Sequence, residues 1–208
     1  MSEVMEFSQT SEQARSPGRR RDDATRRAIL RAAFDIIEAD GYRAFTIEGV
    51  AARSGAGKTT IYRWWPSKEA LAVDAFMAEI PQCGPAGSSG SAIEDLKATL
   101  ARIAENLTEG KNGRVLAAIL GGGQAELETC VQFRDRFLIP RRELGRAVVQ
   151  RGIANGELRA DLDVDAALEA LIAPIYMRLL MRIPPRSPDE MRAFADTVIQ
   201  GMASKAAP

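Results

Sequence analysis

The most informative part of the chain is residues 46–71, TIEGVAARSGAGKTTIYRWWPSKEAL. A short helix is predicted at its start, because Ile47 and Val50 stand at the spacing of one buried helical face. A turn follows at residues 55–57, where glycine adopts left-handed dihedral angles without steric cost. A second short helix begins at Lys58. Two short helices joined by a glycine turn form a helix-turn-helix, whose second helix fits the major groove of DNA.

The ends of these helices are predicted from their capping residues. Thr46 is a suitable N-cap for the first helix, which ends at residue 54. The second helix is expected over residues 58–65. Pro66-Ser67 then ends it and caps a further helix.

Together with the residues that precede it, this segment resembles the N-terminal domain of TetR/AcrR-family transcriptional regulators. The matching pieces are Asp40-Gly41-Tyr42, Phe45-Thr46-Ile47, Val50 to Gly55, Lys58 to Tyr62, and Trp65 to Leu71. Such a set is far more specific than any single short motif. The second half of the chain resembles one group of C-terminal domains of that family more loosely, through NGELRADLD at residues 155–163 and APIYMRLL at residues 173–180.

A competing motif lies inside the same segment. Residues 55–59, GAGKT, imitate the end of the phosphate-binding loop GxxxxGK[ST]. The first glycine of that pattern would fall on Ala52. A phosphate-binding loop also follows a buried β-strand, whereas residues 47–54 have helical periodicity. The sequence therefore favours the helix-turn-helix over a nucleotide-binding loop.

Positive charge is concentrated in the N-terminal part of the chain. The 208 residues contain 28 basic and 28 acidic side chains. Residues 15–68 nevertheless hold 12 Lys and Arg against 6 Asp and Glu, whereas residues 71–208 hold 16 against 18. A basic surface at the helix-turn-helix is what docking onto DNA phosphates requires. The acidic remainder argues against DNA that wraps around the whole molecule.

Composition excludes several classes of site. The chain has no histidine, and Cys83 and Cys130 lack CxxC spacing. We therefore expect no metal site, and a catalytic triad based on histidine is impossible. No cofactor fingerprint is present, so neither a cofactor nor an enzymatic activity is expected. The two cysteines are expected to be reduced thiols that pack as small hydrophobic side chains.

The sequence predicts a cytoplasmic protein. Its first residues are polar and acidic, so no signal peptide is visible. The most apolar run, residues 166–183, contains Glu169, Arg178 and Arg182, which argues against a membrane span.

Three parts are predicted along the chain: a disordered basic arm (1–21), a DNA-binding head with a linking helix (22–80) and a helical body (91–205). The arm ends in Arg19-Arg20-Arg21, which either reaches DNA or is a solvated tail. Residues 81–90, PQCGPAGSSG, have the composition of a loop and separate head from body. The resemblance implies that the body binds a ligand and forms a dimer.

The body shows helical periodicity throughout and no strand pattern, so an all-α fold is predicted. Residues 91–94, SAIE, form a capping box at its start. The glycines at 121–123 indicate a break or a close helix crossing. A long helix is expected over residues 126–155, with a bend near Pro140.

The last two helices are predicted to form the dimer surface. Asp163 or Asp165 caps the first of them, and Ser187-Pro188-Asp189-Glu190 combines a capping box with proline at the first helical position. By resemblance, these helices form a four-helix bundle with a second copy, and the symmetry implies a palindromic operator. The apolar residues 166–180 can also be intramolecular core, on another face of the helix.

Side-chain chemistry and the resemblance agree on how DNA would be read. Lysine pairs with guanine and the threonine methyl group contacts thymine. In the family, the residues at the positions of Lys58 and Thr59 contact bases. The resemblance therefore implies base contacts for Lys58 and Thr59, and for Thr60 a contact shared between base and backbone. Phosphate contacts, which carry no sequence information, are implied for Thr46, Tyr62, Trp64 and Lys68. The alternative for these residues is a solvent-facing or packed side chain.

The resemblance also implies an apolar pocket for a small inducer, whose binding would shift the linking helix and weaken operator binding. The coupling required is on the order of 1–3 kcal/mol. Candidate lining residues are Met77, Leu100, Ile103, Leu116, Phe133, Phe137, Ile175 and Tyr176. Each can instead be plain core. Few charges interrupt the apolar stripes, which favours a largely neutral, hydrophobic ligand.

The sequence therefore predicts a homodimeric, ligand-responsive transcriptional repressor; repression rather than activation follows only from the habit of the family. An enzyme is one alternative, which no nucleophile–base pair supports. A helical interaction protein with a non-functional head is another. Substitution of Lys58, Thr60 and Tyr62 distinguishes these classes, since only a regulator would lose sequence-specific DNA binding.

Overall fold

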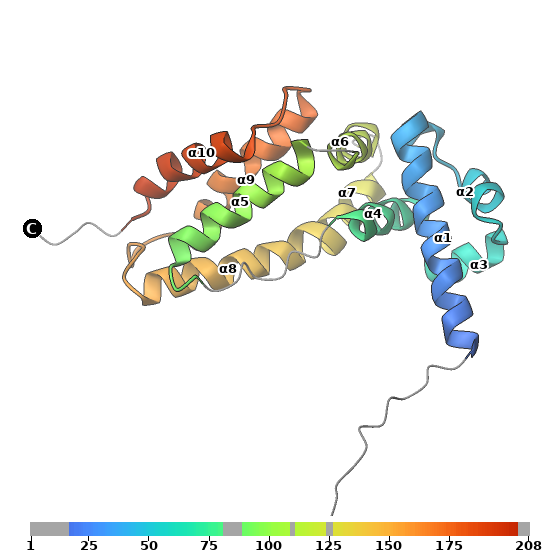
Figure 1. The fold of residues 1–208 in the computed structure, drawn as a ribbon, viewed down its shortest axis with the longest axis horizontal. Coiled ribbons are helices and arrows are strands. Elements are labelled where there is room, and N and C mark those ends of the chain that lie inside the picture. Colours follow the sequence, from blue (N-terminus) through green and yellow to red (C-terminus); the bar gives the residue numbers. More distant parts are fainter. Residues whose placement is uncertain (1–16, 81–88, 109–110, 124–126, 204–208) are drawn as a thin grey trace, which may run out of the picture.

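The fold is all-α, as the sequence predicts. A computed structural model describes residues 17–80, 89–108, 111–123 and 127–203. Within these ranges the regular structure is helical, and the β-structure is one isolated bridge between Leu158 and Ala203. Figure 1 shows a small helical head at one end and a longer helical body that extends away from it.

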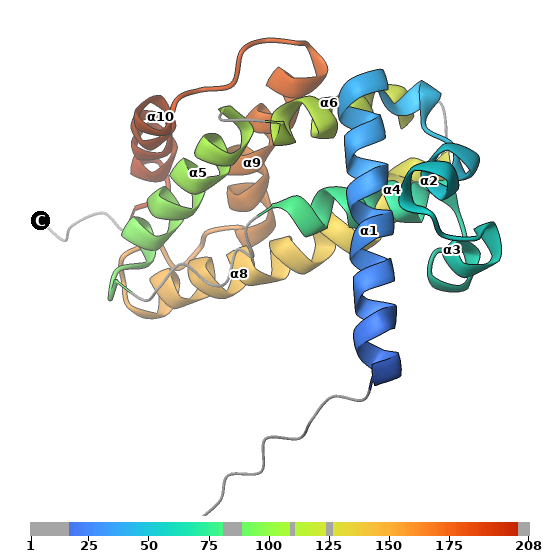
Figure 2. The same cartoon turned by 45° about the vertical axis from the view of Figure 1, so that its right-hand side comes forward.

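The head consists of α1 (Pro17–Asp40), the short 3-10 turn η1 (Tyr42–Ala44), α2 (Ile47–Ser54) and α3 (Lys58–Trp64). Helix α1 stands between α2 and α3 on one side and the body on the other (Figure 2). Large buried side chains from all three helices and their connections meet in its core, among them Phe34, Ile37, Phe45, Val50, Ile61 and Trp65. This core fixes α3 relative to α1.

Local signals set the ends of α2. The Thr46 hydroxyl accepts a hydrogen bond from the Gly49 amide at 3.1 Å, which confirms the predicted N-cap. Gly55 ends the helix with a φ of 72°, in the left-handed region that favours glycine. Gly57 has a φ of −69°, which any residue can adopt. Of the two turn glycines, only Gly55 is required by its backbone conformation.

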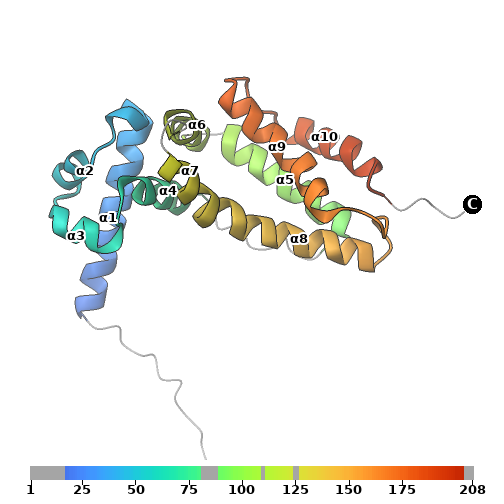
Figure 3. The same ribbon diagram turned by 180° about the vertical axis from the view of Figure 1, so that it is seen from behind.

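The body is built from α5 (Ala92–Thr108), α6 (Asn112–Gly123), α7 (Leu127–Phe133), the π-helical segment η2 (Arg134–Leu138), α8 (Ile139–Ala154), α9 (Val164–Leu180) and α10 (Pro188–Gln200). Helix α4 (Lys68–Glu79) joins head to body and packs against α1, α6 and α7. In the body, α5 packs against α10 and α8, and α8 packs against α9 (Figure 3).

The first helix begins earlier than the sequence predicted. It begins at Pro17, inside the arm predicted over residues 1–21, so residues 19–21 belong to α1 and not to that arm. Proline is well suited to the start of a helix, because its φ is preset and it has no N–H to leave unpaired. The rest of the expected arm, residues 1–16, lies outside the described residues.

The long helix expected over residues 126–155 is present as α7, η2 and α8 in direct succession, with residue 126 outside the described residues. Its irregularity is the π-helical turn Arg134–Leu138, immediately before Pro140 in the first turn of α8. Because Pro140 lies in the first turn of α8, its missing N–H removes no hydrogen bond of that α-helix. Single π-helical turns occur frequently at functional sites.

The caps of the last two helices agree with the sequence prediction. Asp163 accepts hydrogen bonds from the backbone at the start of α9, and Ser187 and Glu190 form a complete capping box on α10. Among the described helices, none combines the length and apolar character needed to cross a bilayer.

The cap of α5 differs from the predicted box. The Ser91 hydroxyl accepts from the Glu94 amide at 3.3 Å, but the carboxylate that completes the cap belongs to Glu157. This carboxylate accepts from the amides of Ala92 at 3.0 Å and Ile93 at 3.3 Å. The helix start is therefore capped by a residue 65 positions from Ala92 in the sequence.

Head and body meet tightly around Tyr42. Helix α6 continues through Gly122, where a Cβ would lie 2.9 Å from the Tyr42 Cβ. The close approach expected for these glycines is present there, and α6 ends at the next residue, Gly123. The Tyr42 hydroxyl is 2.8 Å from the Thr129 hydroxyl of α7, in a buried hydrogen bond. On α1, the Glu38 carboxylate accepts from Arg114 of α6 at 2.6 Å.

Candidate DNA interface and effector cavity

Helix α3 divides its side chains between the core of the head and one exposed face. Ile61 is fully buried, and Trp65, which directly follows the helix, is 1% exposed. Lys58, Thr59 and Tyr62 lie on the opposite face and are exposed, Tyr62 to 51% despite its size. Three side chains expected to contact DNA thus stand together on an accessible surface.

Lys58 is held by a carboxylate of the preceding helix. Its Nζ donates to Glu48 Oε1 at 2.7 Å, and both side chains are exposed to solvent. The hydrogen bond and the opposite charge raise the pKa of Lys58 and lower the pKa of Glu48. This role of Glu48 was not predicted from the sequence, because nothing in helical periodicity pairs it with a residue ten positions away.

The other expected DNA contacts differ in accessibility. Thr46 is exposed, and its hydroxyl can still donate outward while it accepts from the backbone. Thr60 is partly buried, and so is Trp64, whose ring lies under the Arg63 guanidinium at 5.1 Å. Lys68 lies 5.4 Å above the Tyr42 ring, so its side chain turns toward the junction between head and body.

Asp74 on α4 connects the head to the body through both of its carboxylate oxygens. Oδ2 accepts from the Trp65 indole Nε1 at 2.9 Å, directly after α3. Oδ1 accepts from Arg136 Nη1 of η2, also at 2.9 Å. Arg26 of α1 lies 3.9 Å from the same carboxylate. One side chain therefore contacts the end of α3, helix α1 and the π-helical segment.

A cavity of about 330 Å³ lies inside the body, at the lower end of the range typical of ligand sites. Its wall comes from α4, α5, α6, η2, α8 and α9. Six of the candidate lining residues are on this wall: Leu100, Ile103, Leu116, Phe137, Ile175 and Tyr176. Met77 and Phe133 are not on it; Phe133 stacks on Phe137 behind the wall, with ring centroids 4.8 Å apart.

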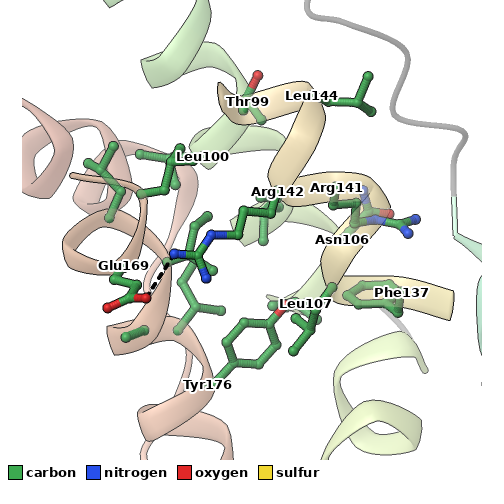
Figure 4. A pocket seen from close by; sticks show the side chains of 18 of the residues that line it. Thr99, Leu100, Asn106, Leu107, Phe137, Arg141, Arg142, Leu144, Glu169 and Tyr176 are labelled. Atoms are coloured by element: carbon green, nitrogen blue, oxygen red, sulfur yellow. Dashed lines mark hydrogen bonds and ion pairs between the residues drawn. The ribbon is translucent and has the colours of Figure 1, made fainter. Parts of the chain in front are cut away.

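The polar part of this wall was not predicted from the sequence. Arg141, Arg142 and Glu169 line the cavity together with Thr99 and Asn106. Figure 4 shows the Arg142–Glu169 hydrogen bond and, further along α9, Tyr176. The arginines are on α8, whose apolar periodicity is weak, so no sequence pattern indicates which of its side chains face inward.

The Tyr176 phenol is set in apolar surroundings. Burial raises the pKa of Tyr176 to about 12, although the nearby charge of Arg141 opposes the shift. The hydroxyl is therefore protonated at neutral pH and can donate a hydrogen bond. Its ring packs edge-on against Phe133 at 6.1 Å.

Sequence profiles identify the family. The profile described as "Bacterial regulatory proteins, tetR family" matches residues 29–75. The profile "Tetracyclin repressor-like, C-terminal domain" matches residues 87–198, more than half of the chain. The chain belongs to the TetR family. It is a DNA-binding transcriptional regulator and not an enzyme, which confirms the resemblance inferred from the helix-turn-helix.

Relatives and solved structures agree with this assignment. An uncharacterized HTH-type transcriptional regulator, YdeS of Bacillus subtilis, is 35% identical over 164 residues, 79% of this chain and 82% of the relative. The crystal structure of the TetR family regulator SCO0332 has a TM-score of 0.70 at 28% identity and covers 88% of this chain and 99% of its own. FadR of Bacillus subtilis in complex with stearoyl-CoA has the same fold, with a TM-score of 0.64 at 21% identity, over 86% of this chain and 98% of its own.

Proposed function

We propose that this TetR-family protein is a homodimeric repressor that a small, mainly apolar molecule releases from a palindromic operator. The observation that carries the proposal is the cavity, whose wall includes α4 and η2. These two segments are also the ones that Asp74 joins to the end of α3. In this proposal the head spans residues 22–80 and the ligand-binding, dimerising body spans residues 91–205.

DNA recognition is assigned to the exposed face of α3. Lys58 and Thr59 contact base edges, and Thr60 is shared between base and backbone. Thr46, Tyr62, Trp64 and Lys68 donate to phosphates. In this proposal Lys58 exchanges its Glu48 partner for a base edge when the operator binds.

The exposed face of α9 supports a dimer. Small and apolar side chains are exposed along it at intervals of three and four residues: Ala166, Ala170, Ala173, Met177 and Leu180. This spacing is the seam along which two helices pack. A two-fold interface on α9 and α10 presents two heads to the operator, about 34–36 Å apart on successive major grooves.

Ligand release is assigned to the shared wall of the cavity. A ligand would contact Phe76 of α4, Ile80 directly after this helix, and Phe137 of η2. Displacement of α4 changes the position of the head relative to its partner. A coupling free energy on the order of 1–3 kcal/mol suffices to weaken operator binding about 5- to 150-fold.

Selection of genomic fragments by the purified protein, followed by footprinting, tests the operator. A protected palindrome is expected, lost on Lys58→Ala and retained on Arg159→Ala, since Arg159 is an exposed residue of the body. Binding that varies with salt but shows no sequence preference would contradict the proposal.

Light scattering tests the dimer. Met177→Glu places a charge on the exposed seam of α9 and is expected to give a monomer that no longer protects both half-sites. Ala147→Glu, an exposed position on α8, is the matched control and should remain dimeric. A dimeric Met177→Glu variant would place the interface elsewhere.

A further inference from the structure

Glu48 brings a negative charge to the surface that the recognition helix presents. It is the only acidic residue in the sequence from residue 46 to residue 65, which also contains Arg53, Lys58 and Arg63. The structure places it in the first turn of α2, where its Oε1 accepts from Lys58 Nζ at 2.7 Å. Since Lys58 belongs to the exposed face of α3, the Glu48 carboxylate lies at that face as well.

The other two cations of this segment have a different kind of partner. Arg53 lies 3.6 Å from Asp35 and Arg63 lies 3.7 Å from Asp22, and both of these carboxylates belong to α1. The pair of Glu48 and Lys58 instead joins α2 to α3, and both of its side chains are more than half exposed, to 64% and 54%. Such an exposed ion pair contributes little to stability, so its exchange for other partners costs little.

A carboxylate that is brought against DNA requires a hydrogen-bond donor, because phosphates repel it and its removal from water is otherwise unfavourable. In the major groove, lysine donates to O6 and N7 of guanine, and glutamate accepts from the N4 amino group of cytosine. A G·C pair presents two acceptors followed by this donor, an order that neither A·T nor T·A has. The ammonium and carboxylate, already side by side, are complementary to that order.

We infer that Glu48 is a specificity-determining residue, which accepts from the N4 amino group of a cytosine while Lys58 donates to the guanine of the same base pair. The inference rests on the proposed function, which assigns a base contact to Lys58 and none to Glu48. Both groups exchange partners when the operator binds, so neither charge is left unpaired. The reversed C·G pair is rejected, because it places guanine acceptors opposite the carboxylate.

Selection from a library of random DNA duplexes is the first part of the test, with the full-length wild type and its variants. The wild-type motif is expected to contain a G·C pair in each half-site that Glu48→Ala and Lys58→Ala each cease to prefer, while the remaining positions are kept. Asp40→Ala, which removes an exposed carboxylate at the end of α1, is the control and should select the whole motif.

The second part replaces each cytosine of the selected half-site in turn by N4-methylcytosine, which still pairs with guanine but presents a methyl group in place of the free N–H. Fluorescence anisotropy is expected to show that one replacement weakens the wild type about tenfold and Glu48→Ala by less than about twofold. Glu48→Gln should keep part of the sensitivity, because its amide oxygen still accepts. A carboxylate that only stabilises the start of α2 would give no such dependence on the cytosine amino group.

Wild-type binding that no N4-methylcytosine weakens, or equal sensitivity in the wild type and in Glu48→Ala, would overturn the inference. A motif that changes in Lys58→Ala but not in Glu48→Ala would overturn it too and leave the proposed function intact. Failure of the wild type to select any sequence would contradict the proposed function itself. If circular dichroism shows that Glu48→Ala is unfolded, Glu48→Gln decides, since it keeps the size of the side chain: an unrelaxed preference for the G·C pair would then count against Glu48.

Discussion

Arg136 of the body and Asp74 of the linking helix are joined by a hydrogen bond of 2.9 Å, on the carboxylate that also accepts from Trp65. Arg136 stands next to Phe137 in the π-helical segment, and Phe137 lines the cavity. A ligand that displaces Phe137 therefore acts one residue from the contact that holds the end of the recognition helix. This places a physical connection between the cavity and α3.

Loss of this contact is expected to reduce communication between the two sites. Arg136→Gln removes the guanidinium group and its charge and shortens the side chain, so the contact with Asp74 is lost while Trp65 retains its acceptor. We expect the ligand-induced loss of operator affinity to fall by about 1 kcal/mol, roughly fivefold. Fluorescence anisotropy of labelled operator with and without ligand measures it.

Arg134→Gln is the control for this measurement, because Arg134 is exposed and pairs only with its neighbour Asp135 among the contacts of the described chain. Equal coupling in the wild type and in Arg136→Gln would exclude the Asp74 contact as the connection. Asp74→Ala is a separate case, since it also leaves the Trp65 indole N–H without an acceptor and should cost about 1–3 kcal/mol of stability.

Glu48 is expected to restrain binding to DNA phosphates. Glu48→Gln removes the carboxylate that holds Lys58 at 2.7 Å and frees its ammonium group. Binding to non-operator DNA should become severalfold tighter, and the slope of log affinity against log salt should steepen by about 1, the contribution of one phosphate contact. Titration at several salt concentrations measures the slope. An unchanged slope would mean that Lys58 already contacts phosphate in the wild type, and Glu143→Gln, far along the body, serves as the control.

The head could be predicted closely from sequence because its signals are local. Thr46 caps the helix that begins one residue later, and Gly55 ends it in the left-handed conformation. Asp74 and Arg136 are 62 residues apart, and their contact depends on how separate helices pack, which no periodicity encodes. The same holds for Glu157, whose partners at the start of α5 are assigned only by the folded structure.

The lining of the cavity could be predicted only in part, because apolar periodicity is also a local signal. Apolar periodicity marks which side chains face inward, and Leu100 and Phe137 are indeed on the wall. It does not tell whether an inward side chain meets a void or another side chain. Phe133 faces inward as predicted, but its ring packs against Phe137 and Tyr176 and does not line the cavity.

The crossing between α6 and the head is expected to tolerate no side chain at Gly122. A Cβ there would lie 2.9 Å from the Tyr42 Cβ, an atom close to the backbone that cannot move away cheaply. Gly122→Ala should lower the free energy of unfolding by about 1–3 kcal/mol, as other overpacked sites do. Gly121→Ala is the matched control: a Cβ there has no neighbour within 4 Å among the described atoms, so alanine should stabilise the helix by up to about 1 kcal/mol. Urea unfolding measures both, and equal effects would contradict the close crossing.

The cap of α5 by Glu157 is expected to make stability depend on pH. Hydrogen bonds from the Ser91 hydroxyl and from the amides of Ala92 and Ile93 lower the pKa of Glu157 below its usual value of 4.5. A carboxyl whose pKa is lowered by folding stabilises the native state above the pKa of the unfolded chain. That contribution is lost as the pH falls through the lowered value.

Glu157→Gln should therefore be less stable than the wild type by about 1–2 kcal/mol at pH 7, because a neutral amide is a weaker acceptor for the helix start. The difference should shrink at pH 3, because below the usual pKa of 4.5 the stabilisation by the charged carboxylate decreases as the pH falls. Urea unfolding of both proteins at the two pH values measures it. Glu105 is an exposed glutamate of α5, the helix that Glu157 caps. Glu105→Gln is therefore the control, and its free energy of unfolding should differ little from that of the wild type at either pH. If Glu157→Gln lowers the free energy of unfolding by the same amount at pH 3 and pH 7, the charge of the carboxylate does not contribute to the cap.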